Sequence, residues 1–272
     1  MLAIKNNVMA SNAARHLGMS YDNLAQSVER LSSGLRINSA KDDAAGLAVR
    51  ELMRADIAVL EQGARNAQDG ISMLQTMEGA MAVIDEALVR MKQLAEQAAT
   101  GSYSDAQRSL MENEFREMAA EIERIAGSTS FNNIRLLNSA GQNIAIHFGG
   151  STDFITVPGT DMTQSGLGIT SALVSIGTLT AARSALAVLD SAISTKDTAR
   201  ARFGYKMNRL EGTISVLNIQ KENLMASESR VSDVDVALEM AEMTRNQVLA
   251  QAGIAMLAQA NTMPQMALTL LQ

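Results

Sequence analysis

Residues 57–98 read IAVLEQGARNAQDGISMLQTMEGAMAVIDEALVRMKQLAEQA, and this stretch determines the class of the fold. Its apolar side chains recur at alternating steps of three and four, which is the spacing of one buried face of a long helix. The same signal begins at Asp43 and ends at the helix-breaking residues 100–102. A helix of this length spans roughly 85 Å at about 1.5 Å per residue, more than a compact domain of this mass holds. The sequence therefore predicts a mainly α fold of long helical rods.

Helices are also expected before and after this rod. An apolar seam predicts an N-terminal helix over about residues 5–32, followed by a joint at 33–43 that is rich in capping residues. After the rod, Ser104-x-x-Gln107 matches a capping box, and we expect Gly127 to close the helix that it opens.

The C-terminal half repeats this arrangement in mirror order. A heptad seam resumes near Thr180 and continues to Leu224, and three basic residues interrupt it: Lys196, Arg200 and Lys221. Residues 232–235 supply capping groups for a last helix, which we expect to run to about Asn261 and to end at Pro264. Helices in this order pair antiparallel when the chain folds back on itself. We expect a terminal coiled-coil domain of residues 1–40 plus 230–272 and a rod domain of residues 41–229.

The middle of the chain has a different composition. Residues 136–180 contain seven Gly and only two charged residues, Asp153 and Asp161. Two short alternating segments, 143–148 and 153–157, flank the turn residues Gly149-Gly150-Ser151. The fold class is thus mainly α, with long antiparallel helices, paired terminal helices and one small β-hairpin insert at about 136–180.

Composition argues against an enzyme. The chain has no Cys, and its two His residues, His16 and His147, are far apart, so thiolate, zinc and imidazole chemistry have no residues to use. The pairs Asp42-Asp43 and Asp233/Asp235 open helices and are expected to be caps. A net charge of −6 without a basic stripe excludes a nucleic-acid scaffold. We expect no catalytic residue, no cofactor and no metal.

The C-terminal segment 246–272 carries no charged residue. Glutamines, Asn261 and Pro264 interrupt its apolar residues too often for a membrane span, so we expect a buried protein interface. Residues 1–7 have no long apolar run, and a secretory signal peptide is therefore not expected.

Two separated motifs identify the family that the chain resembles. The first is LSSGLRINSAKDDAAGLA at residues 31–48, and the second comprises SRV-x-D-x-D-x-A at 229–237 with QVLAQAG at 247–253, LAQAN at 257–261 and Pro264-Gln265. Over essentially its whole length the chain resembles bacterial flagellin. The outer variable domains of larger flagellins have no counterpart here.

The resemblance implies a structural subunit of the extracellular flagellar filament, which assembles into a helical tube and serves as the motility propeller. It also implies flagellar cap and hook–filament junction proteins as partners, a flagellar export chaperone on the C-terminal segment, and export by the flagellar type III route without a cleaved signal peptide. Apolar residues of both terminal helices are expected to drive the polymerisation of identical chains. These assembly residues are Leu17, Leu24, Val28, Leu31, Val248, Leu249, Ile254, Leu257, Leu268 and Leu271.

The resemblance further implies a patch for an innate immune receptor. The vertebrate Toll-like receptor that senses flagellin recognises a helical patch in the family, and Arg90, Leu94, Gln97 and Glu114 resemble that patch. Arg90, Leu94 and Gln97 lie at steps of four and three, on one helix face.

Two other functions would also suit long helices. A hook–filament junction protein shares related terminal helices, and a soluble signalling coiled coil would form a dimer of helical hairpins with a charged tip. An enzyme-bearing flagellin would need a metalloprotease insert, and no H-E-x-x-H motif occurs.

Overall fold

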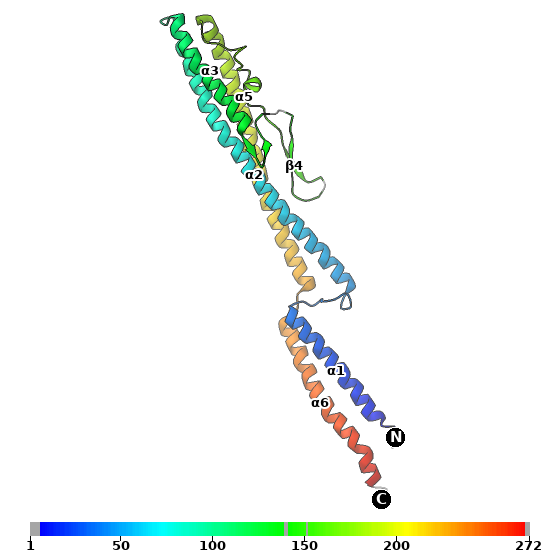
Figure 1. Ribbon diagram of the computed structural model, residues 1–272. Helices are drawn as coiled ribbons and strands as arrows, with labels where there is room; N and C mark the ends of the chain where they lie inside the picture. Colours follow the sequence, from blue (N-terminus) through cyan, green and yellow to red (C-terminus); the bar gives the residue numbers. More distant parts are fainter. Residues whose placement is uncertain (1–5, 139–140, 151, 270–272) are drawn as a thin grey trace. The chain divides into compact units, whose positions relative to one another are not determined.

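A computed structural model describes residues 6–138, 141–150 and 152–269, with side chains as far as residue 263 (Figure 1). The mainly α fold is confirmed. The long helices are α1 (Val8–Ser33), α2 (Ala44–Ala98), α3 (Asp105–Ser128), α5 (Leu179–Ser232) and α6 (Val236–Thr269). No helix within the described residues is long and apolar enough to cross a membrane.

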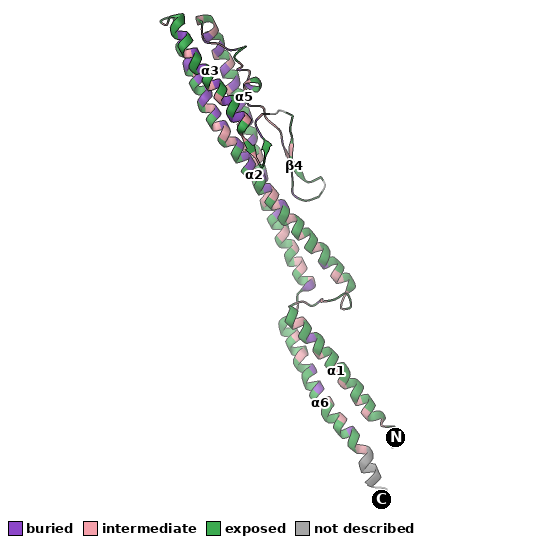
Figure 2. Cartoon of the chain, viewed as in Figure 1, coloured by how far each residue is buried: buried purple, intermediate pink, exposed green. Residues whose placement is uncertain are grey.

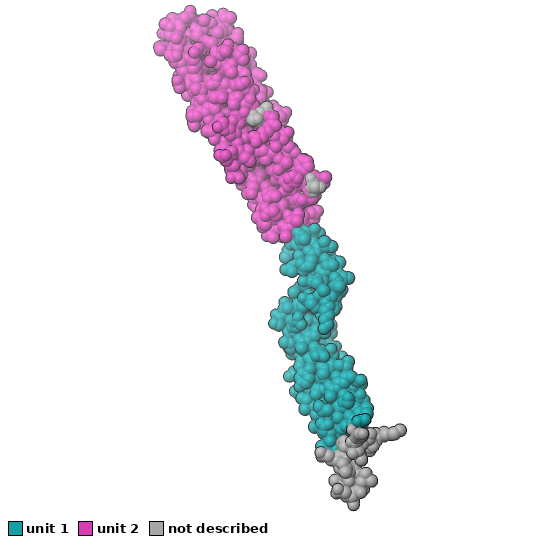
Figure 3. All heavy atoms as spheres, turned by 45° about the vertical axis from the view of Figure 1, so that its right-hand side comes forward, with its two compact units in different colours: residues 1–57, 222–272 teal, residues 58–221 magenta. Residues whose placement is uncertain are grey.

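The chain forms two compact units, residues 58–221 and residues 1–57 with 222–272 (Figure 3). In the first unit, parts of α2 and α5 pack together with α3 around one apolar core. Met77, Leu88 and Met91 of the α2 seam are fully buried and belong to one apolar cluster with Phe115 of α3 and Phe203 of α5. Figure 2 shows buried residues in purple along these helices. The division at residues 40 and 230 that the sequence suggests stays a prediction.

The caps of α3 follow the sequence closely at one end only. Ser104 Oγ accepts from the Gln107 N–H, and Gln107 Oε1 accepts from the Ser104 N–H at 2.9 Å, so the capping box is confirmed. At the other end the prediction was wrong, because Gly127 lies inside the helix and Thr129 is the cap. Thr129 Oγ1 donates to the Ile125 carbonyl at 2.7 Å, which satisfies an end carbonyl without a left-handed glycine.

The insert contains more structure than one hairpin. The predicted hairpin is confirmed as β3 (Ile144–His147) paired antiparallel with β4 (Phe154–Val157). An unpredicted hairpin, β1 (Ser130–Phe131) and β2 (Ile134–Arg135), precedes it. Its turn residues Asn132 and Asn133 have φ of 47° and 66°, a left-handed conformation that Asn tolerates better than most residues. A single-turn helix, α4 (Gln164–Leu167), was also not predicted.

The helix α6 continues past Pro264 to Thr269, so the expected end at Pro264 was wrong. A proline removes one backbone donor from a helix and lowers its stability, but residues beyond it can still close hydrogen bonds to the preceding turn. The residues on both sides of Pro264 are helical, so the helix continues through the proline.

Candidate functional site

The helices α1 and α6 pair antiparallel (Figure 1). Asn7, at the start of α1, donates from Nδ2 to the carbonyl of Ala260 at 2.8 Å. At the opposite ends of the two helices, Arg30 and Glu239 form an ion pair with an N–O distance of 3.6 Å. Midway, Gly253 faces Leu17 so closely that a β-carbon on Gly253 would lie 3.1 Å from Leu17 Cδ1. This glycine allows the two helices to approach each other.

The structure divides the predicted assembly residues into two groups. Leu17, Leu24, Leu31 and Leu257 are half-buried, whereas Val28, Val248, Leu249 and Ile254 are exposed. Leu268 lies in α6 beyond the last described side chain, and Leu271 lies outside the described residues. One partner helix therefore covers only one face of each terminal helix, as Figure 2 shows by the green that dominates both.

Further exposed apolar side chains on these helices were not among the predicted assembly residues. They are Val8, Met9, Met19 and Tyr21 on α1 and Val236, Leu238, Met240 and Met256 on α6. Together with Val28, Val248, Leu249 and Ile254 they form what we call the open apolar surface of the α1–α6 pair. The signal for them is present in the sequence, since both helices place apolar residues on more than one face.

Backbone hydrogen bonds join the two segments that connect to α1 and α6. Gly34 ends α1 with φ of 73°, and the following chain forms a short antiparallel bridge between Leu35 and Asp233. The Arg36 N–H donates to the Ser232 carbonyl at 2.7 Å, and the Val234 N–H donates to the Gly34 carbonyl at 3.1 Å. These bonds fix the point at which the α1–α6 pair begins.

One aspartate of each joint caps the helix that follows, whereas the expected cap role was wrong for Asp42 and for Asp233, which accepts from the Ser229 hydroxyl at 2.6 Å. Asp43 Oδ1 accepts from the Gly46 N–H at 2.8 Å, and Asp235 Oδ1 accepts from the Ala237 and Leu238 N–H groups. Asp42 Oδ2 accepts from the Ser39 N–H at 2.9 Å, which holds the pKa of Asp42 below its ordinary value. Within the described ranges no group of three or more His, Cys, Asp or Glu side chains could hold a metal ion.

The predicted receptor-patch residues lie in the 58–221 unit. Arg90 on α2 and Glu114 on α3 are exposed and form an ion pair at 2.6 Å. Gln97 is exposed and donates to the Tyr103 hydroxyl at 3.0 Å. Leu94 differs from the other three, because its side chain belongs to the core and is 2% exposed. The structure thus brings Arg90 and Glu114 together and places Leu94 in the core.

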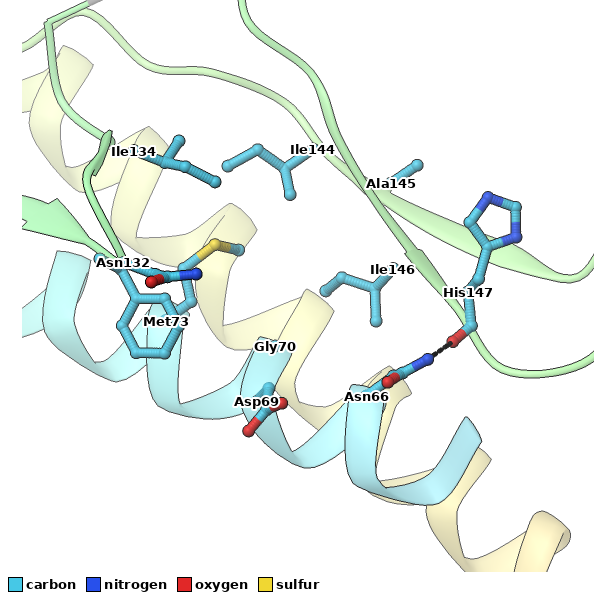
Figure 4. A pocket seen from close by; sticks show the side chains of 11 residues that line it. Asn66, Asp69, Gly70, Met73, Asn132, Ile134, Ile144, Ala145, Ile146 and His147 are labelled. Atoms are coloured by element: carbon cyan, nitrogen blue, oxygen red, sulfur yellow. Dashed lines mark hydrogen bonds between the residues drawn. The ribbon is translucent and has the colours of Figure 1, made fainter. Parts of the chain in front are cut away.

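A groove of about 360 Å³ lies between α2 and the two hairpins (Figure 4). Two glycines of α2, one heptad apart, let the β3–β4 hairpin lie directly on the helix. A β-carbon on Gly70 would be 2.4 Å from Ile146 Cδ1, and one on Gly63 would be 2.0 Å from the Phe148 carbonyl oxygen. Asn66 donates to the His147 carbonyl at 2.9 Å, while the exposed His147 ring lies beside the Phe154 ring at a centroid distance of 5.3 Å. These contacts attach the β3–β4 hairpin to α2.

Comparison with known proteins identifies the family. The family model for the bacterial flagellin N-terminal helical region matches residues 4–142, and the model for the C-terminal helical region matches residues 186–271. The chain belongs to the bacterial flagellins. It is 41% identical to a flagellin of Halalkalibacterium halodurans and 39% identical to a flagellin of Bacillus subtilis, and each alignment covers all of both chains. A flagellar filament core protein of Treponema phagedenis is 39% identical over the full length of both.

Solved structures agree with this flagellin fold. The crystal structure of Bacillus cereus flagellin is 30% identical with a TM-score of 0.51, and the likeness covers 60% of this chain and 94% of that one. A putative flagellar hook-associated protein from Vibrio parahaemolyticus has a TM-score of 0.59 over 71% of this chain and 100% of that one. At 14% identity this second likeness shows the fold alone.

This flagellin is a structural subunit that polymerises with copies of itself into the extracellular flagellar filament, and it is not an enzyme. The predicted filament function is confirmed. The comparisons favour neither the hook–filament junction protein nor the soluble signalling rod.

Proposed function

We propose that subunits join the filament through the open apolar surface of the α1–α6 pair. The exposed state of Val248, Leu249 and Ile254 supports this proposal, because one antiparallel partner leaves these side chains in water. Burial of each such side chain contributes about 1.5–3 kcal/mol, so several of them per subunit stabilise a polymer strongly. Leu17, Leu24, Leu31 and Leu257 act indirectly, by holding α1 and α6 together. Leu268 and Leu271, which come later in the same C-terminal sequence, are proposed to contribute to the same contact between subunits.

Seeded polymerisation tests this surface. The Val248→Ser, Leu249→Ser, Ile254→Ser triple variant should fail to elongate short filament seeds, as should a chain lacking residues 246–272. A matched control replaces three exposed glutamines of the same helix, Gln247, Gln251 and Gln259, by Ser. Sedimentation and electron microscopy should find filaments for the wild type and the control. Normal elongation by the apolar triple variant would overturn the proposal.

We further propose that α1 and α6 are unfolded in the free subunit and fold as they enter the filament. The pair has little core of its own, and ordering more than fifty helical residues costs conformational entropy that burial in the polymer offsets. Coupled folding also limits polymerisation before export. Amide exchange should be fast in both helices of the free subunit and slow in the filament. Strong protection in the free subunit would contradict the proposal.

Export is proposed to follow the flagellar type III route, with a flagellar chaperone covering the C-terminal segment. The uncharged stretch after Arg245 and its exposed apolar residues support this idea, since such a segment aggregates unless it is covered. Cap and hook–filament junction proteins would contact the two ends of the polymer. Deletion of residues 246–272 should abolish chaperone binding. Binding that persists after the deletion would show that the chaperone does not bind this segment.

The exposed receptor-patch residues Arg90, Gln97 and Glu114 are proposed to bind the flagellin-sensing Toll-like receptor, with Leu94 supporting them from the core. Their cross-helix ion pair, which presents a preformed charged group to solvent, supports this assignment. Arg90→Ala should weaken receptor signalling by the free subunit. Arg124→Ala is the matched control, because Arg124 is also exposed and paired with a carboxylate, Glu121, on α3. Equal signalling by both variants would contradict the assignment.

A further inference from the structure

Methionines are sorted by exposure between the two units. All eight methionines of residues 58–221 are buried or half-buried. In contrast, Met9 and Met19 on α1 are 62% and 55% exposed, and Met240 and Met256 on α6 are 45% and 64% exposed. The chain has no Cys and no Trp, so thioether sulfurs are its most readily oxidised side-chain groups. Five methionines are exposed among the described side chains, and four of them lie on the open apolar surface; the fifth, Met225, lies on α5 and is 50% exposed.

We propose that Met9, Met19, Met240 and Met256 are oxidation sites through which hydrogen peroxide controls polymerisation. The inference rests on the proposed assembly role of the open apolar surface. A lone pair of the thioether sulfur attacks one peroxide oxygen, an S–O bond forms and the O–O bond breaks. Sulfur is oxidised by two electrons to a sulfoxide, and the peroxide is reduced to water, with the proton of the transferred hydroxyl passing to the leaving hydroxide.

The four residues are distributed along the helix pair. The contact between Asn7 and Ala260 places Met9 and Met256 toward the same end of the pair, and the Arg30–Glu239 ion pair places Met240 toward the other. Met19 lies between them, two residues after Leu17. A subunit oxidised at any one of these positions carries a polar oxygen into an otherwise apolar contact.

Folding of the subunit does not require methionine at these positions. Leucine has the same helix propensity and a similar volume, and substitutions between the two are well tolerated. Methionine adds a flexible side chain that adapts to neighbours, together with sensitivity to oxidation. The buried methionines Met77, Met81 and Met91 supply an internal reference, because they have the same chemistry without access to peroxide.

Peptide mass spectrometry after graded peroxide treatment tests the sites. In free subunits, the four surface methionines should gain one oxygen atom at least about tenfold faster than Met77, Met81 and Met91, because exposure governs the rate. In assembled filaments their rate should fall toward that of the buried methionines. Equal rates for surface and buried methionines in free subunits, or unchanged surface rates in filaments, would overturn the inference.

Polymerisation of the oxidised chain tests the consequence. Peroxide-treated wild type should elongate seeds at least about tenfold more slowly than untreated chain, and methionine sulfoxide reductases for both epimers should restore the rate. The Met9→Leu, Met19→Leu, Met240→Leu, Met256→Leu variant should resist the same treatment, whereas Met73→Leu, Met77→Leu should not. Oxidised wild type that elongates at the untreated rate would overturn this inference alone. Failure of untreated wild type to elongate would overturn the proposed assembly function as well.

Discussion

The two compact units of this flagellin use apolar residues in opposite ways. In residues 58–221, the seams of α2, α3 and α5 close on one another, and Met81, Ile84, Leu88 and Ile122 have no exposed surface. In the α1–α6 pair, the seam is narrow, and large apolar side chains face water on the remaining sides. A three-helix arrangement buries more of each helix than a pair does. The first unit therefore closes a core of its own, whereas the α1–α6 pair leaves apolar side chains exposed for the contact between subunits that we propose.

Charged residues show the same difference. Lys196 on α5 is 2% exposed and pairs with Asp85 on α2 and with Asp197 at 2.8 Å. Arg108 is also buried, and it donates to the carbonyls of Ala98 and Thr100 at the end of α2. The Lys196–Asp85 pair links α5 to α2, and the Arg108 hydrogen bonds link α3 to the end of α2. On the terminal pair, the Arg30–Glu239 contact is longer, at 3.6 Å, and the Arg30 side chain is 27% exposed, compared with 3% for the side chain of Lys196.

The largest expected effect is on the core of the 58–221 unit. Phe115→Ala should lower the free energy of unfolding of the free subunit by about 3–5 kcal/mol, because Phe115 is fully buried between helices and leaves a cavity. Leu110→Ala on the same helix is the control, since Leu110 is 71% exposed and should change stability by less than about 0.5 kcal/mol. Denaturant titration measures both. Similar losses for the two variants would mean that this unit has no closed core.

A substitution on the α1–α6 pair should affect polymerisation and leave the stability of the free subunit unchanged. Leu249→Ala should leave the stability of the free subunit unchanged and raise the critical concentration for polymerisation about thirtyfold, from loss of about 2 kcal/mol of burial per subunit. Gln251→Ala, at an exposed polar position of α6, should change neither quantity. Sedimentation of filaments at equilibrium gives the critical concentration. A destabilised free subunit would show that α6 already packs there through Leu249.

Two substitutions at the buried Lys196–Asp85 pair test whether the pair contributes to the stability of the free subunit. Asp85→Ala should destabilise the free subunit by about 1.5 kcal/mol, because Lys196 then keeps only Asp197 as a charged partner. Lys196→Met removes the buried charge as well and should be close to neutral. If Lys196→Met proves more harmful than Asp85→Ala in denaturant titration, the ion pair itself provides net stability.

The pH dependence of unfolding follows from the same group. Burial alone lowers the pKa of Lys196, but hydrogen bonds to Asp197 and Asp85 outweigh this effect and raise the pKa above its ordinary value of 10.5. A raised lysine pKa stabilises the folded state below pH 10.5, and the stabilisation is lost as the pH rises through the folded-state pKa. Wild type should therefore lose stability above pH 10.5 relative to Lys196→Met. Parallel pH profiles for the two chains would contradict this.

Much of this fold follows from sequence periodicity and caps. Helical seams, the Ser104 capping box and the β3–β4 hairpin depend on neighbouring residues, and these local patterns predicted them. The β1–β2 hairpin had only a two-residue signal, Asn132-Asn133, which propensity alone does not single out. The partner of Lys196 is 111 residues away, so only the tertiary register reveals it.

The candidate site shows the same limit. The apolar character of α1 and α6 was predictable, but which of their side chains stay in water depends on how the two helices pair. Leu17 and Leu257 were expected only as assembly residues, and the structure shows both half-buried in the helix pair. Val248 and Leu249 are exposed because a single partner covers one face only. Leu94 belongs to both the α2 seam and the receptor motif, and the structure places it in the seam.

The smallest expected effect tests the contact between α1 and α6. Gly18→Ala and Gly253→Ala both replace a helical glycine, and each gains up to about 1 kcal/mol of helix propensity. Nothing lies within 4 Å of a β-carbon at Gly18, whereas one at Gly253 meets Leu17 Cδ1 at 3.1 Å. Gly18→Ala should therefore lower the critical concentration about fivefold, and Gly253→Ala should lower it less, because Leu17 must shift. The double variant Leu17→Ala, Gly253→Ala relieves the crowding but loses the leucine contact, so it should polymerise worse than either single glycine variant. If Gly253→Ala equals Gly18→Ala, then α1 and α6 lie farther apart in the filament than in this pair.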